Sequence, residues 1–226
     1  SSIGGKTGVN LNEGKNLIGT FHQPNSVIID PELLMSLPEI EIKSGLGEVI
    51  KYGAIKDPNI LSMVLSWVRG GSHLNDSRIV ELIVLSCKIK SDIVVRDEKE
   101  NNLRRILNFG HTFGHALEAA TEYKYFTHGE AVMHGMQFAV RLSQEIFKLE
   151  NEQFINLLTC IELLNIKVVP KLSQQDVMEL MMKDKKRVKS KINFILLNEP
   201  GKPIIIDDIP MKTIEHHIKT YLQDFS

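Results

Sequence analysis

Three stretches of the sequence carry side chains of the kind that bind metal ions. They are HTFGH at 111–115, HGE at 128–130 and GEVIK at 47–51. Two imidazoles and one carboxylate form a ligand set found in catalytic zinc sites, which keep further positions open for water or substrate. Glu48 can supply the carboxylate. The spacing alone leaves two histidine pairs open, His111 with His115 one helical turn later, or His111 with His128.

Each stretch also has an ordinary explanation when it is taken alone. Two histidines on a helix can be surface residues, and a histidine ahead of a helix can be a polar residue at its start. Glu48 and Lys51 are three residues apart on one helical face, the spacing of a surface ion pair. The metal hypothesis therefore depends on the three stretches meeting in the fold.

The segment 103–121, LRRILNFGHTFGHALEAAT, is predicted to be one amphipathic helix. On a helical projection Arg104, Asn108, His111 and His115 share a wedge of about 60°. A solvated stripe is normally rich in Lys and Glu, so this composition favours a functional face. Two glycines inside the helix, at 110 and 114, cost about 1 kcal/mol each relative to alanine, which indicates close approach by another backbone or a ligand.

Periodicity and turn residues predict a mainly helical fold with a small β-hairpin. The first 30 residues are expected to be loop with a short strand, Val27–Ile29, and Glu32–Leu37 a helical turn. Asp76 is the expected N-cap of a long helix ending near Val95. Strands at Ile192–Leu197 and Pro203–Ile206 would form the hairpin. The other expected helices are 45–55, 59–68, 128–149, 151–164, 173–183 and 211–225.

Composition limits the classes of function. Hydrophobic residues make up 42% and charged residues 24%, with a formal net charge of −1. No basic excess indicates nucleic acid, and no apolar run approaches the ~20 residues of a membrane helix. Two cysteines without a CxxC pair favour a reducing compartment, so a cytoplasmic protein is expected. The start inside a glycine-rich loop, SSIGGKTG, suggests a fragment whose preceding domain is missing.

Several long motifs in order resemble the 3-dehydroquinate synthase family. They are GGKTGVN (4–10), GKNLIGTFHQP (14–24), GLGEVIKYG (45–53), SCKIKSDIVVRDEKE (86–100), LNFGHTFGHALE (107–118), HGEAV (128–132) and MKDKKR (182–187). The resemblance implies a mainly α, multi-helix C-terminal domain, with the N-terminal α/β NAD-binding domain absent. Residues 1–40 would be a remnant at the junction with that domain, and 41–226 a helical metal- and substrate-binding domain.

The resemblance also assigns roles that spacing left open. It implies that Glu48, His111 and His128 are the metal ligands, and that His115 is a catalytic or substrate-contacting residue instead. Glu100 corresponds to an acid/base position. The other implied substrate-binding residues are Lys6, Asn16, Lys51, Lys90, Arg104, Asn108 and one of Lys185 and Lys186. The implied contacts on the NAD side are Lys15, Leu33, Leu34, Met35 and Ser36.

The implied reaction converts 3-deoxy-D-arabino-heptulosonate 7-phosphate, a phosphorylated sugar acid, to 3-dehydroquinate and phosphate in the shikimate pathway of aromatic amino acid biosynthesis. The implied cofactors are Zn²⁺ or Co²⁺ and NAD, and the full-length protein is expected to be a homodimer. The 226 residues alone are expected neither to bind NAD tightly nor to turn over. The alternatives are another sugar phosphate cyclase, such as a 2-deoxy-scyllo-inosose synthase, a metal-dependent polyol dehydrogenase, or a non-enzymatic helical module with an incidental metal site.

Overall fold

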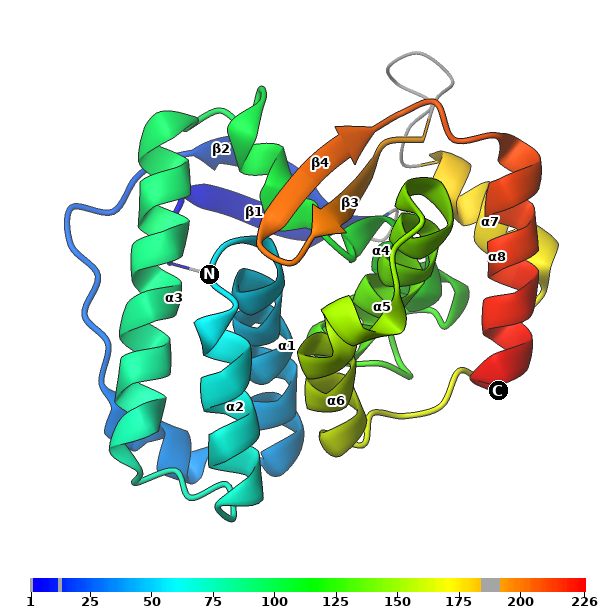
Figure 1. Cartoon of the computed structure of the whole chain (residues 1–226). Coiled ribbons are helices and arrows are strands. Elements are labelled where there is room, and N and C mark those ends of the chain that lie inside the picture. Colours follow the sequence, from blue (N-terminus) through cyan, green and yellow to red (C-terminus); the bar gives the residue numbers. More distant parts are fainter. Residues whose placement is uncertain (1, 12–13, 184–191) are drawn as a thin grey trace. The chain divides into compact units, whose positions relative to one another are not determined.

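The computed structural model describes residues 2–11, 14–183 and 192–226 and is predominantly helical, as predicted (Figure 1). Its chain forms two compact units. Unit 1 contains 1–35 and 74–105, and unit 2 contains 36–73 and 106–226. The predicted boundary near residue 40 separates a junction with a missing domain from a metal- and substrate-binding domain. That division concerns function and stays a prediction. In the described parts of the chain, no helix combines the length and apolar character that crossing a bilayer requires.

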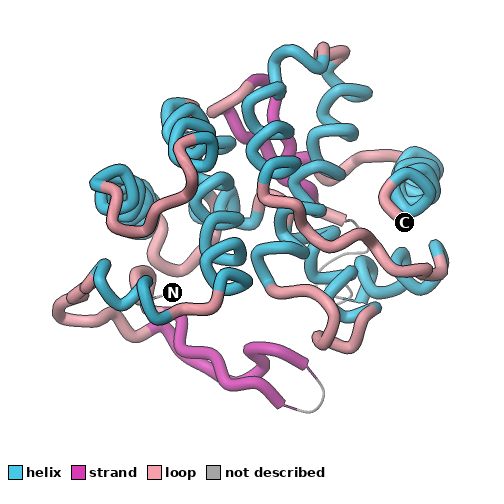
Figure 2. The backbone as a smooth tube through the Cα atoms, turned by 90° about the horizontal axis from the view of Figure 1, so that it is seen from below, coloured by secondary structure: helices cyan, strands magenta, loops and turns pink. Residues whose placement is uncertain are grey.

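Unit 1 pairs a β-hairpin with one long helix. Strands β1 (Lys6–Leu11) and β2 (Gly14–Phe21) are antiparallel, and the described strands are magenta in Figure 2. Helix α3 (Ser77–Arg96) begins at the predicted N-cap, Asp76, whose side chain accepts a hydrogen bond from the Arg78 backbone N–H. The first hairpin was not predicted, because its glycine-rich strands lack an apolar alternation.

The predicted strand Val27–Ile29 is wrong. This segment has no regular secondary structure and belongs to neither described sheet, and Ile28 is 93% exposed. A run of β-branched residues satisfies strand propensity but becomes a strand only when another strand pairs with it. The helical turn that follows is present as the 3₁₀ helix η1 (Pro31–Ser36), so that prediction is confirmed.

Unit 2 is a helical body built around α5 (His128–Phe147), which buries 13 of its residues. Helices α1, α4 and α8 and strand β3 all pack against α5. The predicted C-terminal hairpin is confirmed as β3 (Phe194–Glu199) and β4 (Lys202–Ile206). The remaining elements are α1 (Glu39–Ile55), α2 (Asn59–Arg69), η3 (Asn151–Phe154), α6 (Ile155–Leu163), α7 (Gln174–Lys183) and α8 (Met211–Asp224).

The prediction of a single helix over 103–121 is wrong, because the helical structure is interrupted at Gly110. Residues Leu103–Asn108 form the 3₁₀ helix η2, and α4 (His111–Ala120) starts after Gly110, which has φ +80°. A Cβ at this position would lie 2.7 Å from the Val132 carbonyl oxygen, so only glycine fits the turn. Arg104 and Asn108 therefore do not continue the polar stripe of His111 and His115.

A buried polar network ties α8 to α5. The ring Nε2 of His134 donates to the carbonyl oxygen of Lys167 at 2.8 Å, and its Nδ1 lies 2.8 Å from the Tyr221 hydroxyl. That hydroxyl also contacts Gln137 Oε1 at 2.8 Å. Burial lowers the pKa of His134 below its ordinary value of 6.5, against the smaller opposing effects of the Lys167 carbonyl and Glu130.

This network makes stability depend on pH. Because the pKa of His134 is lower in the folded chain, the unfolded chain takes up a proton first as the pH falls. The contribution of His134 is complete above about pH 6.5 and is lost progressively below it, by at most about 1.4 kcal/mol per pH unit. We expect His134→Gln to reduce the loss of unfolding free energy between pH 7.5 and 5.5, measured by urea denaturation. The exposed His216→Gln variant is the control, and an unchanged pH dependence in His134→Gln would contradict the assignment.

Candidate metal centre

Unit 2 brings Glu48, His111 and His128 together. Glu48 lies on α1, and the two histidines are the first residues of α4 and α5. One potential ligand atom from each lies within 4.8 Å of the others. Glu48 Oε1 is 3.8 Å from Nε2 of His111 and 3.8 Å from Nε2 of His128. Three side chains distant in sequence therefore face one point.

The Glu48 carboxylate is ionised and held in one orientation. Its Oε2 accepts a hydrogen bond from the Lys51 ammonium at 2.7 Å, and Lys51 is only 3% exposed. Burial is the largest single effect and opposes ionisation of Glu48. The charge and hydrogen bond of Lys51, together with the two imidazoles, outweigh it and lower the pKa to about 2. Lys51 thus occupies Oε2 and leaves Oε1 directed at the histidines.

The tautomer of His111 is set by the backbone. Its Nδ1 lies 3.1 Å from the carbonyl oxygen of Phe109, which can only accept, so Nδ1 carries the proton. Burial, with Lys51 nearby, lowers the pKa of His111 well below 6.5 and keeps the ring neutral. Its Nε2 therefore presents a lone pair toward Glu48 Oε1, as a metal ligand requires.

His128 is placed by a helix start and a second carboxylate. Thr127 caps α5 through a capping box with Glu130, which fixes the first turn of the helix. His128 Nδ1 lies 3.4 Å from Oε2 of Glu118, whose side chain is 1% exposed. No role was predicted for Glu118, although it lies in the motif at 107–118 and follows His111 by two helical turns on α4.

The arrangement fits a divalent ion with nitrogen-rich coordination. Glu48 Oε1 is buried and has no hydrogen-bond partner among the residues that the structure describes, an expensive state for a carboxylate oxygen that a bound cation would relieve. Ligand atoms around a tetrahedral zinc are about 3.4 Å apart, so the 3.8 Å separations need to contract by only a few tenths of an ångström. Because Lys51 offsets the charge of Glu48, imidazole donors decide the affinity, which favours zinc or cobalt over magnesium or calcium.

His115 offers a second grouping on the same side of α4. Its ring centroid is 5.2 Å from that of His111 and 6.0 Å from that of His128. His115, Glu118 and His128 also have ligand atoms within 4.8 Å of one another. The ligand pair that spacing left open is therefore open in distance as well, and the unpartnered Oε1 of Glu48 favours the set that contains Glu48.

Unit 1 holds a second group of predicted substrate-binding residues. Lys6 on β1 pairs with Glu100, which has a positive φ of 60°. Arg104 is buried, donates to the carbonyl oxygens of Gly4 at 2.7 Å and Glu98 at 2.6 Å, and stacks over Phe21. Lys90 is half-buried on α3. Arg104 thus fixes the turn that leads into Lys6.

The remaining predicted residues are placed less fully. In unit 2, Asn108 lines a small cavity of about 10 Å³ next to Gly110 and Phe113. Of the predicted NAD contacts on η1, Leu33, Met35 and Ser36 are exposed and Leu34 is half-buried. Lys185 and Lys186 lie outside the described residues, and the side chains of Lys15 and Asn16 lie outside the described side chains.

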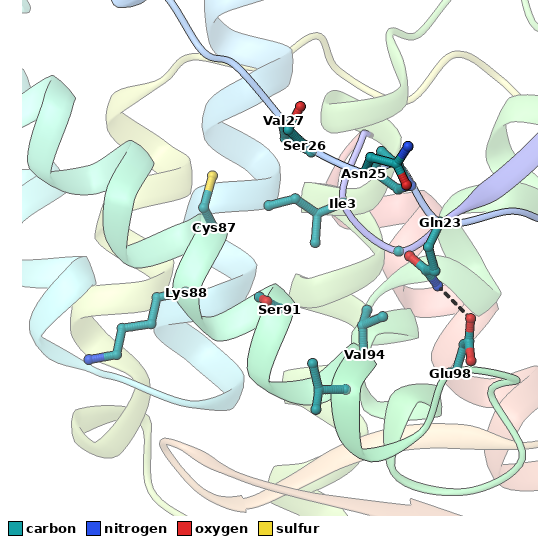
Figure 3. A pocket seen from close by; sticks show the side chains of 13 residues that line it. Ile3, Gln23, Asn25, Ser26, Val27, Cys87, Lys88, Ser91, Val94 and Glu98 are labelled. Carbon is teal, nitrogen blue, oxygen red and sulfur yellow. Dashed lines mark hydrogen bonds between the residues drawn. The ribbon is translucent and has the colours of Figure 1, made fainter.

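A separate cavity of about 640 Å³ lies within unit 1 (Figure 3). One wall is a face of α3 with Cys87, Ser91 and Val94, and the other is the segment from Gln23 to Val27. Gln23 Nε2 donates to Glu98 Oε1 at 3.1 Å across one end. The described residues predicted to bind metal or substrate are not among those that line it.

Comparison with known proteins identifies the family. A model described as the 3-dehydroquinate synthase C-terminal domain matches residues 45–187, and one for the N-terminal domain matches residues 1–44. The chain belongs to the 3-dehydroquinate synthase family. The enzyme of that name from Acidithiobacillus ferrooxidans is 42% identical over 224 residues, which is 99% of this chain and 62% of the relative. The one from Thermoanaerobacter pseudethanolicus is 43% identical over 203 residues, 89% of this chain and 57% of the relative.

Solved structures show the same fold. A 2-epi-5-epi-valiolone synthase from Streptomyces hygroscopicus with NAD⁺ and Zn²⁺ bound superposes with a TM-score of 0.87 at 24% identity, over 99% of this chain and 62% of the other. A 2-deoxy-scyllo-inosose synthase complexed with carbaglucose-6-phosphate, NAD⁺ and Co²⁺ gives 0.75 at 22% identity, over 96% and 62%. The chain thus spans about 62% of the length of these proteins, and it shares their fold.

Proposed function

We propose that this chain provides the metal- and substrate-binding part of a 3-dehydroquinate synthase. That enzyme converts 3-deoxy-D-arabino-heptulosonate 7-phosphate to 3-dehydroquinate and phosphate. The observation that carries the proposal is the buried, unpartnered Oε1 of Glu48, 3.8 Å from two imidazole nitrogens, in a chain of this family. We propose Glu48, His111 and His128 as the ligands of Zn²⁺ or Co²⁺.

Bound at these three residues, the metal would act as a Lewis acid toward a substrate hydroxyl and the carbonyl formed from it. Lys51 keeps Glu48 ionised and aimed by holding Oε2, and its buried charge can attract an anionic group of the substrate. His115 lies one turn after His111, and we propose that it moves protons to and from the substrate.

The charged residues of unit 1 would bind the substrate's carboxylate and phosphate. We propose this role for Lys6, Asn16, Lys90 and Arg104, together with Lys51 and Asn108 and one of Lys185 and Lys186. Arg104 already donates to two backbone carbonyls, so a substrate contact would use its other N–H groups. The pairing of Lys6 with Glu100 holds an ammonium and a candidate acid/base together.

NAD would supply the hydride chemistry. The predicted contacts Lys15 and Leu33–Ser36 are supported by the exposed apolar side chains of Leu33 and Met35 on η1, a surface that can pack against part of a dinucleotide. The proposal also includes a homodimer of the full-length protein, which rests on the family alone.

The decisive assay uses the protein at its natural full length. Supplied with 3-deoxy-D-arabino-heptulosonate 7-phosphate, NAD and zinc, it should release phosphate and 3-dehydroquinate in equal amounts with no net NADH. A chelator should stop the reaction and zinc should restore it. Net NADH formation would point to a polyol dehydrogenase. A carbocycle formed from glucose 6-phosphate, and not from the heptulosonate, would point to a 2-deoxy-scyllo-inosose synthase; either result contradicts the proposal.

A further inference from the structure

We infer that Glu118 is a positioning residue that keeps His128 in the tautomer able to bind metal. The inference rests on the proposed metal site and concerns a residue outside its ligand set. Glu118 lies in the last turns of α4, with a side chain that is 1% exposed, and its Oε2 is 3.4 Å from His128 Nδ1. A carboxylate removed from water to this extent needs hydrogen-bond donors, and an imidazole N–H is one.

The position of Glu118 follows from helix geometry. His111, His115 and Glu118 are separated by four and three residues, so they lie along one side of α4. Helices α4 and α5 pack together, and α5 begins with His128. One face of α4 thereby presents a metal ligand at its start and an acceptor for a second ligand near its end.

The contact between Glu118 and His128 decides which ring nitrogen of His128 carries the proton. A neutral imidazole in water favours the proton on Nε2, and that form has no Nε2 lone pair to donate. A carboxylate at Nδ1 reverses the preference, because it accepts a hydrogen bond only from the Nδ1–H form. The Nε2 of His128, 3.8 Å from Glu48 Oε1, then carries the lone pair. His111 has the same tautomer, held by the Phe109 carbonyl instead.

A competing explanation is that His115, Glu118 and His128 bind an ion themselves, since their ligand atoms also lie within 4.8 Å of one another. The unpartnered buried atom argues against it. Within the described part of the chain Glu48 Oε1 has no hydrogen bond, whereas Glu118 Oε2 already faces a ring nitrogen at hydrogen-bond distance. One ion beside Glu48, supported by Glu118 through His128, accounts for both carboxylates.

The first measurement needs no metal. Imidazole ¹⁵N shifts of the metal-free chain should show Nδ1 of His128 protonated in the wild type. In Glu118→Met, which has similar length and no acceptor, the proton should move to Nε2. Glu118→Gln keeps an acceptor without the charge and should give a mixture. The His111 signals serve as an internal reference and should not change. An unchanged His128 tautomer in Glu118→Met would overturn the inference.

The second measurement is zinc affinity by competition with a chromophoric chelator. Glu118→Met should weaken binding about 10- to 100-fold, the range for loss of a residue that supports a ligand, and Glu118→Gln by less. The control is Glu145→Gln, which neutralises a different carboxylate of unit 2, 2.7 Å from His217 Nε2, and should leave zinc affinity unchanged. Weaker affinity without a tautomer change, or loss of a second zinc, would also overturn the inference. Failure of the wild type to bind zinc would contradict the proposed function. The tautomer measurement needs no metal and would still decide the role of Glu118.

Discussion

Replacing His111 with alanine will abolish stoichiometric zinc binding, whereas replacing His115 with alanine will leave one zinc per chain. The two histidines are one turn apart on α4, with ring centroids 5.2 Å apart. His111 Nε2 faces the buried Glu48 Oε1 at 3.8 Å, and Glu48, His111 and His128 form a group with ligand atoms within 4.8 Å of one another. Losing a ligand should weaken binding by more than the roughly 100-fold that losing a supporting residue costs. The His115 variant is expected to keep its metal and to lose activity in the full-length protein.

Two measurements test the difference between the His111 and His115 variants. They are the metal content after equilibrium dialysis and the zinc affinity of each variant. Glu48→Gln should behave like His111→Ala, because an amide oxygen is a weaker ligand and Lys51 then loses its counter-charge. Thermal unfolding without metal shows whether the two histidine variants remain folded to the same extent. Equal metal loss in both would reject the assignment of Glu48, His111 and His128, and would favour the i, i+4 pair.

The ligand types could be predicted from the sequence because they depend on chemistry that is visible in residue identity. His111 and His128 follow glycine-rich or polar breaks and open helices, and Glu48 shares a face with Lys51. In the structure these three residues have potential ligand atoms within 4.8 Å of one another, and their role as ligands stays a prediction. What spacing could not supply was the choice among the three histidines, which depends on the direction in which α4 and α5 pack. The tautomers inferred for the site depend on the Phe109 carbonyl, two residues before His111, and on Glu118, ten residues before His128. Both contacts are set by the direction in which each imidazole ring points, which spacing does not give.

The break at Gly110 shows why the helix prediction failed there. The apolar and polar periods continue through 103–121, so a pattern analysis favours one helix. The chain instead takes a left-handed turn, because the Val132 carbonyl and Met136 of α5 approach within 3 Å of the place a Cβ would occupy. Tertiary contact decides this backbone conformation, and a glycine in the sequence indicates only that such a conformation is available.

Because α1 and α5 are in contact, we expect Gly129→Ala to destabilise the fold and to weaken zinc binding. We expect Gly45→Ala to do neither. A Cβ on Gly129 would lie 2.0 Å from the carbonyl oxygen of Ser44, a backbone atom that cannot turn aside. One on Gly45 would meet nothing within 4 Å. Gly129 follows His128, and Ser44 lies one turn before Glu48, so separating the helices also separates two ligands. We expect Gly129→Ala to cost about 1–3 kcal/mol or more, as overpacking does.

Gly45→Ala is the matched control because it makes the same chemical change in α1, and it should stabilise the helix by up to about 1 kcal/mol.

Urea denaturation with and without zinc separates the effect on the fold from the effect on zinc binding. Zinc binding to the folded state adds stability in proportion to the logarithm of its concentration over the dissociation constant. A smaller zinc-dependent gain in Gly129→Ala than in Gly45→Ala would show that backbone contact sets the ligand separation. Equal gains, together with a lower stability of Gly129→Ala, would mean that the contact supports the fold without tuning the metal site. Gly47→Ala, whose Cβ would lie 2.8 Å from the Gly129 carbonyl oxygen, should fall between the two, since that approach is less severe.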